Sequence, residues 1–337
     1  MGHRANLAIL EHGLDGPEHR LYYSHWRARS LGCDLFWGPE HATRFVERQR
    51  SQAEGAEWLD EVWAEGGAVI DYTEFRLLWF GGERETNDIP YRRARLGMMA
   101  RMWPTWEIQW AEHGIVDLAL YLDVPVETVV GRWRDDPVDD LDRLLRAASP
   151  GTVESVLTVR RQGRLGALGL GNGVSTLAHQ GQRFLDRLET LDLPQHPDRF
   201  HPGDPFPQGG LHVDFDARTI GWWQALPDWF APRIRDFLPG WTVLDWYGGY
   251  ERHLEAAPCL TLPEVDEPAL MASVVRSLLR EERSGVEIVT SILALDGETV
   301  ESARGVNAFA LRDDLADVPI DERREMLRRH WPHLLPG

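Results

Sequence analysis

The spacing of apolar and polar residues in the first third of the chain alternates between a pattern typical of β-strands and one typical of α-helices. In order, it predicts strands at 5–10 and 21–26, helices around 42–49 and 58–63, strands at 68–71 and 75–80, a helix at 94–103 and a strand at 106–110. Turn-forming Gly, Pro and Asp residues separate the first two strands. Strand pairs that pack against helices in this order indicate an α+β fold class.

This ββ-α-ββ-α-β unit occurs twice. Four motifs recur in the same order and at similar spacing: Arg44-Phe45-Val46-Glu47-Arg48 and Arg183-Phe184-Leu185-Asp186-Arg187; Val69-Ile70-Asp71-Tyr72 and His212-Val213-Asp214-Phe215; Trp79-Phe80 and Trp222-Trp223; Pro104-Thr105-Trp106 and Pro239-Gly240-Trp241. A repeat of this length predicts an internal duplication, in which Asp71 corresponds to Asp214 and Trp79 to Trp222.

The duplication divides the chain into four parts. We predict a first α+β repeat at 1–123, an acidic connecting segment at 124–151, a second α+β repeat at 152–255 and a C-terminal α/β segment at 256–337. The last part has the pattern of a helix at 268–280, a hairpin at 286–295 and 300–309, and a helix at 321–331. Because Arg329-His330-Trp331-Pro332 resembles Arg101-Met102-Trp103-Pro104, a partial third repeat is an alternative for this helix-hairpin-helix segment.

The charge of the chain narrows the classes of partner. It has 54 acidic and 36 basic residues and a net charge of -18. Nucleic acids and anionic membranes repel such a protein, so we expect a basic protein or a small-molecule ligand instead. Arg92, Arg93 and Arg95 beside Tyr91 are a local exception: they form either a cationic patch or a solvated helix paired with acidic residues.

All 36 basic residues are arginine. Without lysine the chain has no phosphate-loop lysine, no kinase lysine and no Schiff-base lysine, which excludes the enzyme classes that need one. The absence of lysine has two explanations that the sequence leaves open, a GC-rich genome and selection against lysine modification.

Cysteine usage and hydropathy favour a soluble, cytoplasmic protein. Cys33 and Cys259 lack a paired or CxxC spacing, so we expect neither a disulfide framework nor a zinc knuckle. The start of the chain has no signal-peptide pattern, and no apolar run approaches the about 20 residues of a membrane span.

The sharpest candidate for chemistry lies at 201–216 in the second repeat. On a strand, His212, Asp214 and Asp216 share one face, where they could act as catalytic acid and base or hold a divalent metal. No metal is expected, but His201, His212 and Asp214 are the candidate ligands if one is present. A structural role is the alternative, because aspartates in a hairpin turn accept backbone hydrogen bonds.

Aromatic residues supply the candidate binding surface. The chain has 15 tryptophans, and most of them must fill cores. The candidates for binding are Trp222, Trp223, Trp246, Tyr247, Tyr250 and His25.

These observations favour a soluble binding or regulatory protein of an immunity or defence type, which binds a protein or a small ligand without a cofactor. The alternative is a hydrolase or metal-dependent enzyme centred on the 201–216 hairpin, which would use a divalent metal. The sequence has no catalytic fingerprint, so it leaves open whether the protein is an enzyme.

Overall fold

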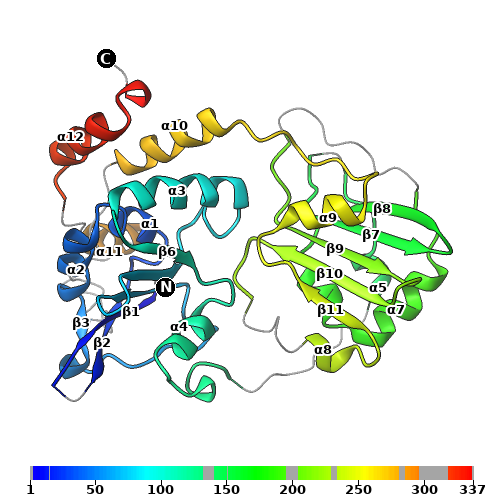
Figure 1. Ribbon diagram of the computed structural model, residues 1–337, viewed down its shortest axis with the longest axis horizontal. Coiled ribbons are helices and arrows are strands. Elements are labelled where there is room, and N and C mark those ends of the chain that lie inside the picture. Colours follow the sequence, from blue (N-terminus) through cyan, green and yellow to red (C-terminus); the bar gives the residue numbers. More distant parts are fainter. Residues whose placement is uncertain are drawn as a thin grey trace. The chain divides into compact units, whose positions relative to one another are not determined.

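The computed structural model describes residues 3–14, 16–131, 140–149, 151–194, 204–228, 234–280, 285–295 and 318–335. The chain forms two compact units (Figure 1). Unit 1 comprises residues 1–85, 91–131 and 266–337, and unit 2 comprises residues 86–90 and 132–265. The C-terminal segment thus belongs to the unit that also contains the start of the chain.

Unit 1 is built on a mixed sheet of six strands in the order β3-β2-β1-β4-β5-β6. The strands are β1 (Ala5–His12), β2 (Pro17–Ser24), β3 (Arg50–Ser51), β4 (Gly66–Asp71), β5 (Arg76–Phe80) and β6 (Glu107–Trp110). The helices are α1 (Leu31–Asp34), α2 (Pro39–Glu47), α3 (Ile89–Met102), α4 (Ile115–Tyr121), α10 (Glu267–Leu278), α11 (Gly285–Leu295) and α12 (Ile320–His330). The pairs β1–β2 and β4–β5 are antiparallel, whereas β1–β4 and β5–β6 are parallel.

Unit 2 is built on a sheet of five strands in the order β11-β10-β9-β7-β8. The strands are β7 (Ser155–Arg161), β8 (Arg164–Leu170), β9 (Gly209–Asp214), β10 (Thr219–Gln224) and β11 (Thr242–Asp245). The helices are α5 (Leu141–Leu144), α6 (Val174–Ala178), α7 (Gly181–Thr190), α8 (Ile234–Phe237) and α9 (Tyr250–Ala256). The pairs β7–β8 and β9–β10 are antiparallel, whereas β7–β9 and β10–β11 are parallel.

The two sheets share strand order and strand directions, which confirms the α+β class and the order of elements in the repeat. The strands β1, β2, β4, β5 and β6 correspond to β7, β8, β9, β10 and β11. Asp71 and Asp214 each end the strand that pairs in parallel with the first strand of the unit. Asp71 pairs with Arg76 of β5, and Asp214 pairs with Thr219 of β10. Trp79 and Trp222 each lie three residues after this partner. The register therefore matches the correspondence predicted from the motifs.

An aromatic contact is also repeated in the same place. The ring of Tyr72 lies edge-on to Trp106 with centroids 5.0 Å apart, and the ring of Phe215 lies edge-on to Trp241 with centroids 5.3 Å apart. Such pairs contribute about 0.5–1.5 kcal/mol beyond the area they bury. The two units thus share a tertiary contact in addition to their strand order.

Each sheet buries one face against the helices that connect its strands. In unit 1 the core joins Ile70 and Trp79 of the sheet to Phe45 of α2. In unit 2 it joins Val213 of the sheet to Phe184 of α7. The last helix of each repeat, α4 or α9, contacts the central strand pair, β4 and β5 or β9 and β10.

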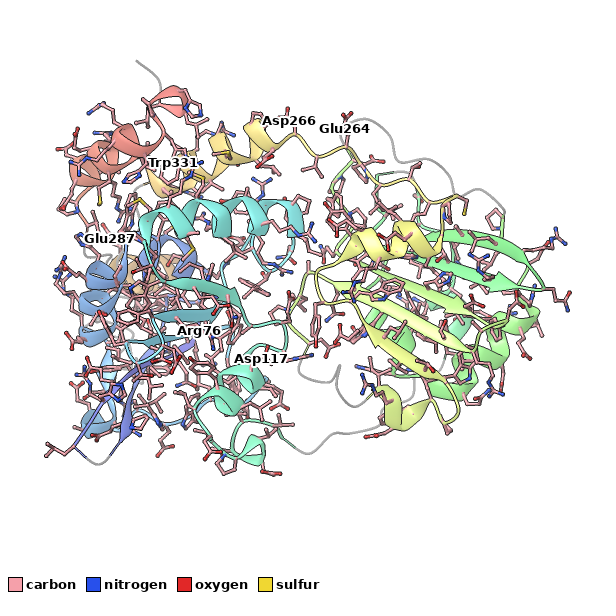
Figure 2. All side chains as sticks on the ribbon, viewed as in Figure 1. Arg76, Asp117, Glu264, Asp266, Glu287 and Trp331 are labelled. Atoms are coloured by element: carbon pink, nitrogen blue, oxygen red, sulfur yellow. The ribbon has the colours of Figure 1, made fainter. Side chains whose placement is uncertain are left out.

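The C-terminal segment completes the core of unit 1 through Trp331, which follows α12 and is fully buried (Figure 2). The Trp331 ring lies 6.2 Å from that of Phe36, and the Arg101 guanidinium lies 5.9 Å from the indole centre. Trp103 is buried in the same core. The partial third repeat stays a prediction, because residues 296–317 lie outside the described part of the chain.

The helix predicted around 58–63 is wrong, because these residues form loop and turn. Asn6 accepts the Leu59 N–H with its side-chain oxygen at 2.7 Å, and Asp60 accepts the N–H groups of Val62 and Trp63, each at 3.1 Å. Side chains that bond to the backbone in this way compete with helical hydrogen bonds.

The strand predicted at 286–295 is also wrong, because these residues belong to α11. Val286, Val289 and Leu293 recur at helical spacing, but a short run rich in Val and Ile is ambiguous between strand and helix. The second predicted strand of this hairpin, 300–309, lies outside the described residues. Among the described residues, no helix is long and apolar enough to cross a bilayer.

Asp71 closes the turn between β4 and β5. One of its carboxylate oxygens accepts the N–H groups of Thr73 at 2.6 Å and Glu74 at 3.1 Å as well as the Thr73 hydroxyl, and the other accepts the Tyr121 hydroxyl. Burial acts to raise the pKa of Asp71, but these hydrogen bonds outweigh it and hold the pKa below its ordinary value. The charged carboxylate therefore stabilises unit 1 at neutral pH, and this contribution is lost as acid protonates it.

We expect Asp71→Ala to lower the free energy of unfolding by about 1–3 kcal/mol and Asp214→Ala by about 0.5–1.5 kcal/mol. The second effect is smaller because Asp214 accepts one N–H, from Ala217 at 2.8 Å, and pairs with Arg160 at 3.3 Å. Urea unfolding followed by tryptophan fluorescence measures both, with Asp71→Asn as the control that keeps the shape without the charge. A larger loss for Asp214→Ala than for Asp71→Ala would contradict this ranking.

Candidate functional site

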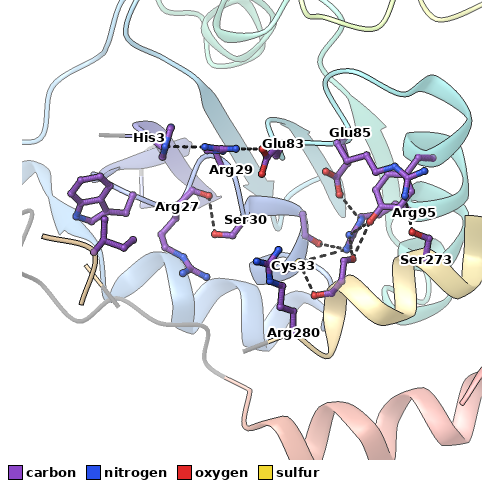
Figure 3. A pocket seen from close by; sticks show the side chains of 16 residues that line it. His3, Arg27, Arg29, Ser30, Cys33, Glu83, Glu85, Arg95, Ser273 and Arg280 are labelled. Atoms are coloured by element: carbon purple, nitrogen blue, oxygen red, sulfur yellow. Dashed lines mark hydrogen bonds and ion pairs between the residues drawn. The ribbon is translucent and has the colours of Figure 1, made fainter. Parts of the chain in front are cut away.

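An open cavity of about 660 Å³ lies in unit 1 (Figure 3). Its walls come from the segment 26–33 after β2, residues 83–85 after β5, the first turns of α3, and the C-terminal helices α10 and α11. A cavity of this size is in the range that holds a small molecule.

Backbone hydrogen bonds fix two of these walls relative to each other. The N–H of Gly82 donates to the carbonyl of Ala28 at 2.7 Å, and the N–H of Glu83 donates to the carbonyl of Arg29 at 3.0 Å. Gly82 has a φ of 84°, in the left-handed region that favours glycine. The loop after β5 is thereby held against the segment after β2, where the side chains of Arg29 and Glu83 form an ion pair.

Arg95 of α3 is the buried centre of the cavity wall. Its Nε lies 2.5 Å from Oε1 of Glu85, and its Nη2 donates to the hydroxyls of Tyr91 at 2.8 Å and Ser277 at 2.6 Å. Burial opposes the charge of Arg95, but Glu85 together with Cys33 and Tyr91 outweighs burial, so the pKa of Arg95 is raised and the group stays cationic. Because Ser277 lies on α10, this cluster ties the C-terminal segment to α3.

A second buried ion pair supports the wall formed by the segment after β2. Nε of Arg27 donates to Oδ2 of Asp34 at 2.9 Å, and Nη2 of Arg27 contacts Oδ1. Both side chains are almost fully buried. A forked arginine–carboxylate pair of this kind holds its two elements in a defined geometry.

The cavity is cationic although the protein as a whole is strongly acidic. Five arginines and two glutamates line it, an excess of three positive charges. The carboxylate of Asp34, which pairs with Arg27, reduces this excess to two. The net charge of the whole chain is -18. The positive charge is therefore a local property of this site.

The guanidinium of Arg280, just after α10, is available to a ligand. Among the described residues none forms a hydrogen bond or ion pair with it. Arg84 differs, because it donates to the Ser273 hydroxyl at 2.6 Å and stacks over the Tyr91 ring at 4.0 Å. Trp26 and Ile288 add apolar surface to the same cavity. The arrangement can bind an anionic group through arginine and an apolar group through the walls.

The structure places His212 in a buried hydrogen-bonded chain of unit 2. Its Nδ1 lies 2.8 Å from the Thr158 hydroxyl, which lies 2.6 Å from Nε2 of His253. Nδ1 of His253 accepts the Trp223 indole N–H at 3.0 Å. Burial lowers the pKa of His212 to about 4 and that of His253 to about 3, so both are neutral at pH 7.

The two candidate aspartates, Asp214 and Asp216, are not part of this chain of hydrogen bonds. Asp214 pairs with Arg160, and Asp216 accepts the N–H groups of Gln162 at 2.7 Å and Gly163 at 2.8 Å. The backbone donors of Gly163 and Gln162 hold the pKa of Asp216 below its ordinary value. These bonds fit the structural alternative, in which the aspartates serve turns.

His201 lies outside the described residues. Within the described part, no group of three or more His, Cys, Asp or Glu side chains could hold a metal ion. The hydrolase or metal-dependent enzyme alternative stays a prediction, which metal analysis of the purified protein tests.

The aromatic binding candidates differ in exposure. Trp222, Trp223 and Trp246 are buried, Tyr250 is half-buried, and Tyr247 is 48% exposed. His25 in unit 1 is buried, and its Nδ1 lies 2.7 Å from the Tyr23 hydroxyl. The His25 ring lies edge-on to Trp26, with centroids 4.8 Å apart. Trp26 lines the cavity, so His25 contacts one of the lining residues but does not itself line the cavity.

The sequence reasoning missed most of the cavity. Its one partial signal was the cluster of arginines beside Tyr91. Arg95 lines the cavity, and Arg92 is buried with its guanidinium 4.5 Å from the centre of the Trp110 ring. Arg29, Arg84 and Arg280 stood in no recognisable motif, because they meet only in the folded unit.

We expect Arg95→Met to lower the free energy of unfolding by about 3–5 kcal/mol, because it leaves Glu85 buried and unpaired. The double variant Arg95→Met/Glu85→Leu should recover a large part of this loss, since it removes both charges. Urea unfolding of the two variants and of Glu85→Leu completes the cycle. A double variant no more stable than Arg95→Met would show that the ion pair is not the source of the effect.

A scan of protein-family models and searches of curated proteins and solved structures found no match to this chain. The site is therefore interpreted from its own geometry.

Proposed function

We propose that the protein is a binding protein whose unit 1 holds a small anionic molecule in the arginine-lined cavity. The observation that carries this proposal is the excess of positive charge in the cavity of a protein with a net charge of -18. In a partly enclosed cavity these charges act at lower effective dielectric than at an open surface, which strengthens attraction to an anion.

The size and the overall charge favour a small ligand over a polyanion. A cavity of about 660 Å³ encloses a metabolite-sized molecule. Nucleic acids and anionic membranes would meet the acidic surface first and be repelled. A small anion can enter without bringing further negative charge near that surface. A basic protein partner, expected from the same overall charge, is the alternative proposal.

The lining also favours binding over catalysis. Arginine keeps its proton throughout the physiological pH range, so it recognises charge and is a poor proton donor or acceptor. Arg95 and Arg27 are held in buried ion pairs with Glu85 and Asp34. These side chains are already ordered before a ligand binds, so binding loses less side-chain conformational entropy.

The charge excess indicates the class of ligand. With two positive charges left after Asp34 is included, a dianion such as a phosphate monoester or a dicarboxylate would neutralise the site. Trp26, Tyr91 and Ile288 could contact an apolar or aromatic part of the same molecule. Phenyl phosphate combines both features and is a suitable probe.

Isothermal titration calorimetry with phenyl phosphate, inorganic phosphate and the neutral probe benzyl alcohol tests this proposal. We expect phenyl phosphate to bind best, with affinity that falls as salt is added. Arg280→Gln should weaken its binding by about 10-fold to 100-fold, the cost of one charged hydrogen bond.

The matched control is Arg276→Gln, because Arg276 is an exposed arginine of α10, the helix that Arg280 follows, and does not line the cavity. It should leave the affinity unchanged. Absence of binding by both phosphate probes, or an equal loss in the two variants, would overturn the proposal.

A further inference from the structure

Unit 2 has a buried polar chain where unit 1 has only apolar side chains. The strand register gives three equivalent pairs: Thr158 and Ala8, His212 and Val69, Trp223 and Phe80. The fourth pair is His253 of α9 and Leu118 of α4, because these side chains approach the equivalent glycines Gly210 and Gly67. All four members of each set are buried. Unit 1 therefore shows that the fold itself does not need the polar groups.

The chain of hydrogen bonds has a defined direction. An indole N–H can only donate, so Trp223 requires a lone pair on Nδ1 of His253. The proton of neutral His253 then lies on Nε2, which donates to the Thr158 oxygen. The Thr158 hydroxyl in turn donates to Nδ1 of His212. Every hydrogen bond of this chain is satisfied when both imidazoles are neutral.

A proton added to either imidazole breaks this arrangement. On Nδ1 of His253 it would face the Trp223 N–H, and two donors would oppose each other. On Nδ1 of His212 it would leave the Thr158 hydroxyl hydrogen without its acceptor. The added charge would also be buried among the Trp246 and Trp223 rings, whose centroids lie 5.7 Å and 6.5 Å from that of His253.

The charged groups near the chain do not stabilise a buried imidazolium pair. Asp214 on β9 favours a charged His212, but Arg160 on β7 opposes it, and these two groups pair with each other. On α9 the charged residues Glu251, Arg252 and Glu255 are exposed to solvent, whereas His253 on the same helix is fully buried. The neighbouring rings on β10 and after β11 are uncharged.

We propose that the Trp223–His253–Thr158–His212 chain makes unit 2 an acid-sensitive domain, which opens in a mildly acidic medium while unit 1 stays folded. These hydrogen bonds connect α9 to the sheet, because His253 comes from the helix and the other three residues come from the strands β7, β9 and β10. Opening would separate α9 from this face. The inference is independent of the ligand proposed for unit 1.

The direction of the pH effect follows from linkage. Both imidazoles have pKa values in the folded chain, about 4 and about 3, below the ordinary value of 6.5. The unfolded chain therefore binds more protons than the folded one as pH falls from about 6.5 toward 4. Stability is full above this window and is lost within it. Each histidine raises the unfolding equilibrium constant by up to about tenfold per pH unit, and the two together by up to about 100-fold.

Hydrogen exchange of the full-length chain, read by mass spectrometry, resolves the two units. We compare about pH 6 with about pH 5 and correct for the intrinsic exchange rate. Protection of β7, β9 and β10 should fall by about 10-fold to 100-fold, beyond any change in β1, β4 and β5. An equal change in both units, or constant protection in unit 2, would overturn the proposal.

Unit 1 supplies the matched variant, Thr158→Ala/His212→Val/Trp223→Phe/His253→Leu, which replaces the chain by its apolar equivalents. Its unit 2 should keep its protection at the lower pH. If this variant does not fold, an NMR titration of the wild-type histidine ring protons decides, with signals assigned by His212→Val and His253→Leu. Titration of both rings near the ordinary histidine value would overturn the proposal.

Discussion

The parallel pairing of β1 with β4 constrains most of unit 1. The hairpin β1–β2 returns the chain to the end of the sheet at which β4 begins, but β1 lies between β2 and β4. The chain must therefore leave the sheet after β2 and cross over β1 before it enters β4. This crossover contains α1 and α2, and its first residues, 26–33, form a wall of the cavity. The pairing of β7 with β9 imposes the same crossover on unit 2, through α6 and α7. The site of unit 1 thus lies where the topology requires the chain to leave the sheet.

The repeated order of elements could be predicted because local patterns carry it. Strand alternation and turn residues mark the hairpins, and the recurrence of Asp71 and Trp79 as Asp214 and Trp222 fixes the register. The errors occurred where tertiary bonds override local pattern. The side chain of Asn6, distant in sequence, accepts the Leu59 N–H, and this bond competes with the helix expected around 58–63. The Val-rich and Ile-rich sequence of α11 reads equally well as a strand until its neighbours are known.

The cavity could not be predicted, because its residues acquire their roles only through contacts distant in sequence. Arg95 is a surface-type residue by composition, yet Glu85 and Ser277 make it the buried centre of the wall. Ser277 and Arg280 come from a segment that lies after the whole second repeat. No spacing rule relates such residues. In contrast, the buried position of His212 follows from its strand register once the duplication is recognised.

The buried ion pairs of unit 1 and the buried polar chain of unit 2 lie on opposite faces of equivalent sheets. The ion pairs of unit 1 lie among α1, α3 and α10, whereas the polar chain of unit 2 lies under α9. The scaffold tolerates each change because the buried arginines pair with carboxylates and both imidazoles have hydrogen-bond partners, which limits the desolvation cost. Thr158 illustrates the condition, since one hydroxyl both accepts from His253 and donates to His212. A serine would offer the same hydrogen bonds, but the γ-methyl group of Thr158 adds buried apolar surface that Ala8, which ends at Cβ, lacks at the equivalent position.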